Sequence, residues 1–165
     1  MFEIKDKFYL NGKQFKIISG AFHYFRTVPE YWQDRLEKLV NMGCNTVETY
    51  IPWNFHEPNR GQFIWEGMRD ICRFIETAQE LGLYIIIRPS PYICSEWEFG
   101  GLPAWLLRDR NMRLRCSYEP YLNAVKNYYS ELIPKLVPYQ IDRGGNIILM
   151  QTLFRSERVR LLRQR

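Results

Sequence analysis

The residues best suited to chemistry lie in the segment ICSEWEFGGLPAWL, which spans residues 93–106 and follows a run of isoleucines. It places Glu96 and Glu98 beside Trp97, with a glycine pair soon after them. Carboxylates accept hydrogen bonds from hydroxyl groups, and aromatic faces cover the C–H patches of a sugar ring. The segment therefore raises two possibilities: the two glutamates are the acid and base of an enzyme, or they hold a ligand that other residues cut.

Two further segments carry polar and aromatic residues of the same kind. The first follows an apolar stretch that closes near residue 20, and the second follows the apolar segment NTVETY at residues 45–50. The residues concerned are His23, Tyr24, Arg26, Glu48, Tyr50, Trp53, Asn54, His56 and Glu57, together with Arg88 and Tyr92 before the third segment. This chemistry of carboxylates, amide, arginine and rings favours carbohydrate as the ligand.

Each of these residues also has a purely structural explanation. Trp97 and Trp105 can serve as anchors for their loop, and the segment His56-Glu57-Pro58 can simply shape a turn. Most aromatic residues in any protein fill its core. Glu96 is harder to explain in this way, because a carboxylate between Cys94 and Trp97 needs partners if it is buried.

The apolar pattern predicts which elements position these residues. Strands are expected within residues 2–20 around a turn at Asn11–Gly12, and again at 45–50, 83–89 and 146–151. Helices are expected from Pro29 to Gly43, from about residue 71 to Gly82, and over 118–137, where Pro134 should kink or split the helix. In the first helix the predicted apolar face consists of Trp32, Leu36, Leu39 and Val40.

Alternating helices and near-continuous apolar strands predict an α/β fold with parallel pairing. The chemically unusual residues then lie just beyond the carboxyl ends of the strands, where such folds bind ligands. An open doubly wound sheet would carry a glycine-rich phosphate turn after its first strand, and SGAFHYF is not one. A (β/α)8 TIM barrel needs about 250 residues, and only about four strand-helix units are visible in 165.

Composition adds few constraints. Five arginines and one glutamate in residues 152–165 account for most of the net charge of +5, so we expect a basic tail and no nucleic-acid partner. The four cysteines form no C-x-x-C pair, and we expect no metal and no cofactor. No secretory signal or apolar span is visible, which predicts a cytoplasmic protein with no membrane partner.

Three segments resemble glycoside hydrolase family 35, the β-galactosidases, in the right order. They are SGAFHYFR at residues 19–26, ETYIPWNFHEP at 48–58 and RPSPYICSEWEFGGLPAWLL at 88–107, and the resemblance extends over about residues 8–151. It implies a TIM barrel and a retaining β-galactosidase that removes terminal β-D-galactose. In such an enzyme one glutamate after strand four donates the proton and another after strand seven attacks the anomeric carbon.

The resemblance also assigns roles to residues of this chain. Tyr50 and Glu96 match positions that bind the galactose hydroxyls, Cys94 and Ser95 contribute from the same loop, and Arg26 supports the site electrostatically. Glu98 is expected to belong to the structure of the loop, so neither glutamate of the segment 93–106 is the proton donor. The implied partner is a β-galactoside substrate, and a homo-oligomer is left open for a complete enzyme.

The chain departs from the family pattern after Gln151. The family reads approximately V-E-N-E-Y-G there, whereas this chain reads TLFRSERVRLLRQR. We therefore expect residues 1–151 to be the amino-terminal half of a catalytic barrel and residues 152–165 to be a tail that arises from truncation or a frameshift. Both catalytic carboxylates would lie beyond Gln151, so the chain alone is expected to be inactive, with a non-catalytic sugar-binding remnant as the alternative.

Overall fold

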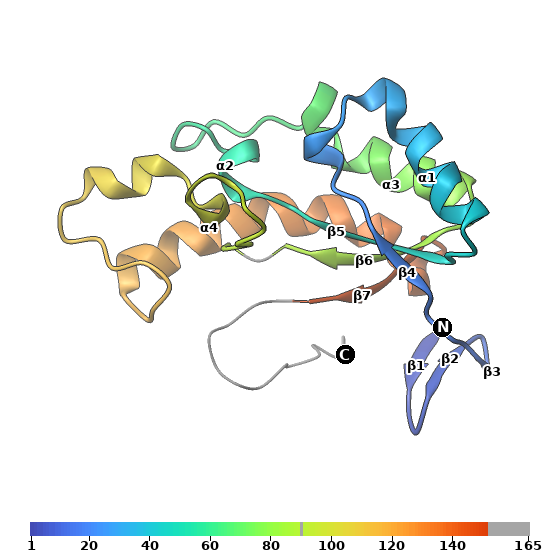
Figure 1. Ribbon diagram of the computed structural model, residues 1–165. Helices are drawn as coiled ribbons and strands as arrows, with labels where there is room; N and C mark the ends of the chain where they lie inside the picture. Colours follow the sequence, from blue (N-terminus) through green and yellow to red (C-terminus); the bar gives the residue numbers. More distant parts are fainter. Residues whose placement is uncertain (90, 152–165) are drawn as a thin grey trace.

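The computed structural model describes residues 1–89 and 91–151, so the expectations for the tail at 152–165 lie outside the described residues. The chain forms two sheets (Figure 1). The smaller sheet is antiparallel and contains β1 (Phe2–Ile4), β2 (Phe8–Leu10) and β3 (Lys13–Gln14). The predicted turn at Asn11–Gly12 joins β2 to β3.

The larger sheet is parallel, as predicted. It contains β4 (Ser19–Ala21), β5 (Thr46–Tyr50), β6 (Tyr84–Arg88) and β7 (Ile147–Met150), and their order in the sheet is their order in the chain. The three longer strands fall within the ranges predicted from the apolar runs. This neighbour-to-neighbour order is the one that a barrel requires, and the described residues provide part of such a barrel.

The principal helices lie on one side of the parallel sheet (Figure 1). They are α1 (Trp32–Asn41), α3 (Ile71–Glu80) and α4 (Glu119–Leu136), and a short helix α2 (Trp53–His56) follows β5. Asp70 caps α3, since its side chain accepts a hydrogen bond from the amide of Arg73 at 2.9 Å. Short 3-10 helices occur at Tyr24–Arg26, Pro29–Tyr31, Gly67–Arg69, Glu98–Gly101, Ala104–Arg108, Val137–Tyr139 and Ile141–Arg143.

The structure corrects two details of the predicted helices. Of the two outcomes predicted at Pro134, a kink or a split, the split does not occur, because α4 runs through this residue to Leu136 as one element. Val40 does not belong to the buried face of α1: it is exposed, whereas Trp32 and Leu36 are buried. The apolar face of α1 is therefore narrower than the predicted four residues.

Along the central strands, successive side chains point alternately to the two faces of the parallel sheet. Val47, Thr49, Ile85 and Ile87 are fully buried in the layer between the sheet and the helices. Their neighbours along the strands, including Glu48, Tyr50 and Arg88, are only partly buried and point to the opposite face. The helix layer is thus the core, and the opposite face is free to carry polar groups.

The small sheet covers the amino-terminal end of this opposite face. The ring of Phe15 lies edge-on to the ring of Tyr84 with centroids 5.2 Å apart, and Phe2 packs against Phe15 at 6.4 Å. The carboxyl-terminal end of the same face lacks such a cover within the described residues. None of the helices in residues 1–89 and 91–151 is long and apolar enough to cross a membrane.

Candidate active site

The polar residues predicted to share one rim lie at the carboxyl ends of β4, β5 and β6 or follow them. Because these strands are parallel neighbours, their carboxyl ends meet at one edge of the sheet. The segment after β4 contacts the end of β5 and the loop after β6. The ring of His23 lies 5.2 Å from that of Tyr50, and Arg26 donates a hydrogen bond to the carbonyl of Ser95. Tyr50 and the 94–96 segment are therefore brought to the same edge.

Tyr50 and Arg88 lie side by side because they are register partners in β5 and β6. The guanidinium carbon of Arg88 is 4.1 Å from the centroid of the Tyr50 ring, and Arg88 Nη1 donates to Glu48 Oε1 at 2.7 Å. Sequence reasoning placed Glu48 and Arg88 at the rim but did not recognise their pairing. This pairing depends on the register of β5 with β6, which sequence reasoning did not supply.

His23 completes this group from the side of β4. Burial lowers its pKa, the nearby charges of Arg26 and Arg88 lower it further, and the carboxylate of Glu48 acts in the opposite direction. His23 is therefore neutral at neutral pH. Its Nδ1 atom is buried without a hydrogen-bond partner among the described residues.

The loop that carries Cys94, Ser95 and Glu96 has an unusual backbone. Their φ angles are 62°, 48° and 44°, so three successive residues other than glycine adopt the left-handed conformation. Such conformations cost about 1–3 kcal/mol each and cluster at functional sites. No feature of the residue types predicts this geometry, because cysteine, serine and glutamate have no strong preference for it.

Several hydrogen bonds hold this loop in place. The amide of Trp97 donates to the carbonyl of Cys94 at 3.0 Å, and the Ser95 hydroxyl donates to the carbonyl of Ile93 at 3.1 Å. Arg26 also lies over the ring of Trp97, 5.7 Å from its centroid. Arg26 is thus a tether between the segment after β4 and the loop after β6. The side chains of Cys94 and Glu96 are exposed.

Trp97 and Trp105 anchor their segments, which was one of the two interpretations open for them. Trp97 Nε1 donates to Asn54 Oδ1 at 2.9 Å, and Trp105 Nε1 donates to the carbonyl of Glu57 at 3.0 Å. The backbone of Glu98 accepts a hydrogen bond from Asn54 Nδ2 at 3.2 Å, while its carboxylate is exposed.

The segment His56-Glu57-Pro58 does shape a turn, and it is built from buried polar groups. Glu57 is 3% exposed, and its carboxylate accepts hydrogen bonds from Trp53 Nε1 at 2.6 Å and from the amide of Gly61 at 2.7 Å. His56 Nδ1 donates to the carbonyl of Ile64 at 3.1 Å, which leaves Nε2 to accept a hydrogen bond from the Tyr24 hydroxyl. The bond between Tyr24 and His56 joins the segment after β4 to α2.

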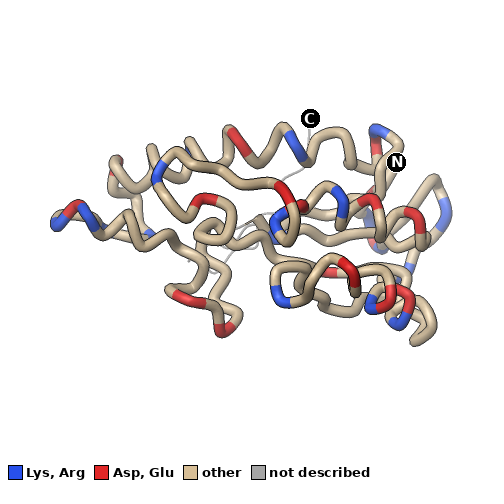
Figure 2. Tube along the Cα trace, turned by 90° about the horizontal axis from the view of Figure 1, so that it is seen from above, with Lys and Arg blue, Asp and Glu red and all other residues tan. Residues whose placement is uncertain are grey.

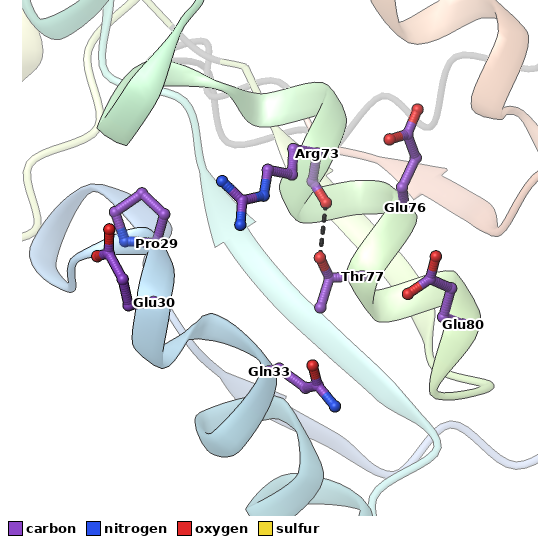
Figure 3. Close-up of a pocket in the computed structure, with 7 residues that line it drawn as sticks. All are labelled: Pro29, Glu30, Gln33, Arg73, Glu76, Thr77 and Glu80. Atoms are coloured by element: carbon purple, nitrogen blue, oxygen red, sulfur yellow. Dashed lines mark hydrogen bonds between the residues drawn. The ribbon is translucent and has the colours of Figure 1, made fainter.

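A hollow of about 280 Å³ lies elsewhere, on the outer side of the helix layer (Figure 3). Three glutamates and one arginine line it: Glu30 comes from the 3-10 helix before α1, and Arg73, Glu76 and Glu80 come from α3. The Thr77 hydroxyl donates back to the carbonyl of Arg73 at 2.8 Å. It contains no aromatic face for a sugar ring. Within residues 1–89 and 91–151, no group of three or more His, Cys, Asp or Glu side chains is placed to hold a metal ion.

Comparisons with known proteins agree with this geometry. The family model for Glycosyl hydrolases family 35 matches residues 7–153. Beta-galactosidase of Mus musculus is 49% identical over 147 residues, which are 89% of this chain and 23% of that protein. Beta-galactosidase-1-like protein 2 of Homo sapiens is 50% identical over 144 residues, which are 87% of this chain and 23% of that protein.

Solved structures support the fold. A GH5_18 protein from Streptomyces cattleya in complex with GlcNAc has a TM-score of 0.63 at 18% identity, covering 81% of this chain and 32% of that one. Beta-galactosidase from Marinomonas ef1 has a TM-score of 0.59 at 15% identity, covering 83% of this chain and 21% of that one. The chain spans about a quarter of the length of the curated relatives it matches. On the family match and these identities, the chain belongs to glycosyl hydrolases family 35.

Proposed function

We propose that the described rim is the sugar-holding part of a retaining β-galactosidase site. Tyr50 and Glu96 bind the galactose hydroxyls, Cys94 and Ser95 contribute from the backbone of their loop, and Arg26 keeps that loop in place. The observation that carries the proposal is the convergence of Tyr50 and the strained 94–96 segment at one edge of the parallel sheet. The family match gives the reaction class.

The 165-residue chain by itself is proposed to bind galactose without hydrolysing galactosides. Retaining hydrolysis needs two carboxyl groups about 5 Å apart, one to donate a proton and one to attack. Among the rim carboxylates, Glu48 is held by Arg88 and Glu57 is buried with two donors, which disfavours both as catalysts. The segment N-E-Y-G, which supplies the acid/base in the family, is not part of the sequence.

Thermal unfolding of the 165-residue chain with D-galactose tests the binding part. Sugar at about ten times its Kd stabilises the folded state by about 1.4 kcal/mol, which raises the Tm by about 3–5 °C. Tyr50→Phe and Glu96→Gln should each abolish most of this shift. Glu98→Gln is the matched control in the same loop and should keep it.

Hydrolysis of an aryl β-galactoside tests the other part. The purified chain should give no turnover above a heat-killed sample, and turnover would mean that the catalytic groups have been misplaced. A wild-type Tm that does not respond to galactose at any soluble concentration would contradict the sugar-binding role itself.

A further inference from the structure

The ring of Tyr50 is flanked on both sides by side chains of the neighbouring strands. Arg88 of β6 is its register partner, with the guanidinium carbon 4.1 Å from the ring centroid. His23, which follows β4, lies on the other side with its ring centroid at 5.2 Å. Because β5 lies between β4 and β6, the ring is confined from both directions along the sheet.

Arg88 is itself held in place by Glu48. The ion pair has an Nη1 to Oε1 distance of 2.7 Å, and its side chains are 16% and 27% exposed. Such partial burial makes the pair stronger than a fully exposed one. Glu48 precedes Tyr50 by two residues in β5, so both project to the same face of the sheet. Glu48, Arg88 and Tyr50 therefore form a triangle across two strands.

Some hydrogen-bonding groups of Glu48, Arg88 and Tyr50 have partners among the described residues and others do not. Arg88 Nε is buried without a partner among the described residues, which costs free energy. Among the side-chain hydrogen bonds within residues 1–89 and 91–151, Tyr50 takes part through its backbone carbonyl and not through its hydroxyl. Arg88 thus contacts the ring of Tyr50 and leaves its hydroxyl available.

We propose that Arg88, held by Glu48, is a positioning residue that fixes the Tyr50 ring so that its hydroxyl meets a sugar hydroxyl in one geometry. This inference rests on the proposed function of the rim. Fixing a binding group before the ligand arrives lowers the entropic cost of binding. The planar guanidinium can lie against the ring and pair with Glu48 at once, which the point charge of a lysine cannot do equally well.

A double-mutant cycle on galactose affinity, measured by NMR titration of the 165-residue chain, tests this role. Arg88→Lys and Tyr50→Phe should each weaken binding about 5- to 10-fold, and Glu48→Gln about 2- to 3-fold. Because Arg88 acts through the tyrosine hydroxyl, Arg88→Lys should weaken binding no further in the Tyr50→Phe background. Equal losses in both backgrounds would overturn the proposal.

Ligand-free spectra separate this inference from the proposed function. Chain labelled with 13C in its tyrosine rings gives Tyr50 signals that the Tyr50→Phe variant identifies. Arg88→Lys and Glu48→Gln should move these signals, and the exposed control Arg35→Lys should not. If wild-type chain fails to bind galactose, the proposed function fails, and unchanged Tyr50 signals in both variants would overturn the positioning role independently. Glu48→Gln preserves side-chain volume, which keeps the test valid if Arg88→Lys unfolds.

Discussion

At the scale of single residues, the rim contains two kinds of polar side chain. Glu57, His56 and Asn54 have their hydrogen-bonding groups satisfied within the fold. Tyr50 is partly buried and Glu96 is exposed, and both lie at the edge of the sheet that carries the proposed site. Buried polar groups are costly unless they are paired, so the first kind stabilises the loops. The second kind carries the proposed binding role.

His56 should make the stability of the fold depend on pH. Burial lowers its pKa to about 3, and the charge of Arg69 adds to this, while the hydrogen bond to the Ile64 carbonyl opposes it. Below the unfolded-state pKa of about 6.5, the unfolded chain binds a proton that the folded chain does not. The free energy of unfolding should therefore fall by up to about 1.4 kcal/mol for each pH unit from about 6.5 downward.

Urea unfolding at pH 7 and pH 5 measures this effect. His56→Gln should have lower stability at pH 7, because the Tyr24 and Ile64 bonds are altered, but should lose about 2 kcal/mol less than wild type on going to pH 5. The loss of stability of His23→Gln between pH 7 and pH 5 serves as the comparison, since the pKa of His23 is also lowered. Equal losses for wild type and His56→Gln would contradict a neutral buried His56.

At the scale of elements, the loop after β6 depends on close packing of its backbone. Gly100 has φ of +61°, and a Cβ atom added there would lie 2.0 Å from Cε2 of Tyr92. No rearrangement of the Cβ relieves such a contact, so the ring of Tyr92 or the loop would have to move. Gly100 is therefore required both because its φ is positive and because the Tyr92 ring leaves no space for a Cβ atom.

Gly100→Ala should therefore cost more than a substitution at a glycine of the same conformation in open space. Gly82, which follows α3, has φ of +73° and nothing within 4 Å of an added Cβ, so Gly82→Ala measures the conformational cost alone, about 1–2 kcal/mol. Chemical denaturation should give a larger loss for Gly100→Ala, accompanied by faster hydrogen exchange in residues 93–101. Similar losses for the two variants would mean that the loop accommodates a methyl group freely.

The elements also illustrate what the sequence could predict. Apolar runs such as YIIIR and stop signals such as Gly82 are local, and they located β6 and α3 closely. The left-handed residues Cys94 to Glu96 depend on contacts with Arg26 and Ile93, which are distant or invisible in the sequence. The pairing of Glu48 with Arg88 depends on the register between β5 and β6. The apolar pattern of one strand constrains this register only once it is aligned with the pattern of the other strand.

At the scale of the whole molecule, the parallel sheet has one face with helices and one face without them in the described part of the chain (Figure 1). Within residues 1–89 and 91–151, basic and acidic residues are interspersed along the trace, so no broad region of a single charge is evident in this part (Figure 2). The face without helices carries Ile86 and Leu149, both partly buried. Apolar side chains and strand edges that lack a cover promote association between chains.

The 165-residue chain should accordingly self-associate in solution. Sedimentation velocity between about 5 and 100 µM should show an average mass that rises with concentration, because apolar contact between open sheet faces is favourable. Leu149→Lys should reduce this association by introducing a charge on the open face. Val40→Lys, at an exposed position of α1, is the control and should leave it unchanged. A monomer at every concentration would contradict this prediction.

The order of the parallel strands has a consequence for biosynthesis. Since each strand pairs with the one that precedes it in the chain, the sheet can be extended one unit at a time while the ribosome is still translating. The hydrogen bonds between β4 and β5 do not require β7. The contact of Tyr50 with Arg88 can form once β6 has emerged. The part of the rim formed by Tyr50 and Arg88 can thus assemble in the nascent polypeptide before β7 is available to the sheet.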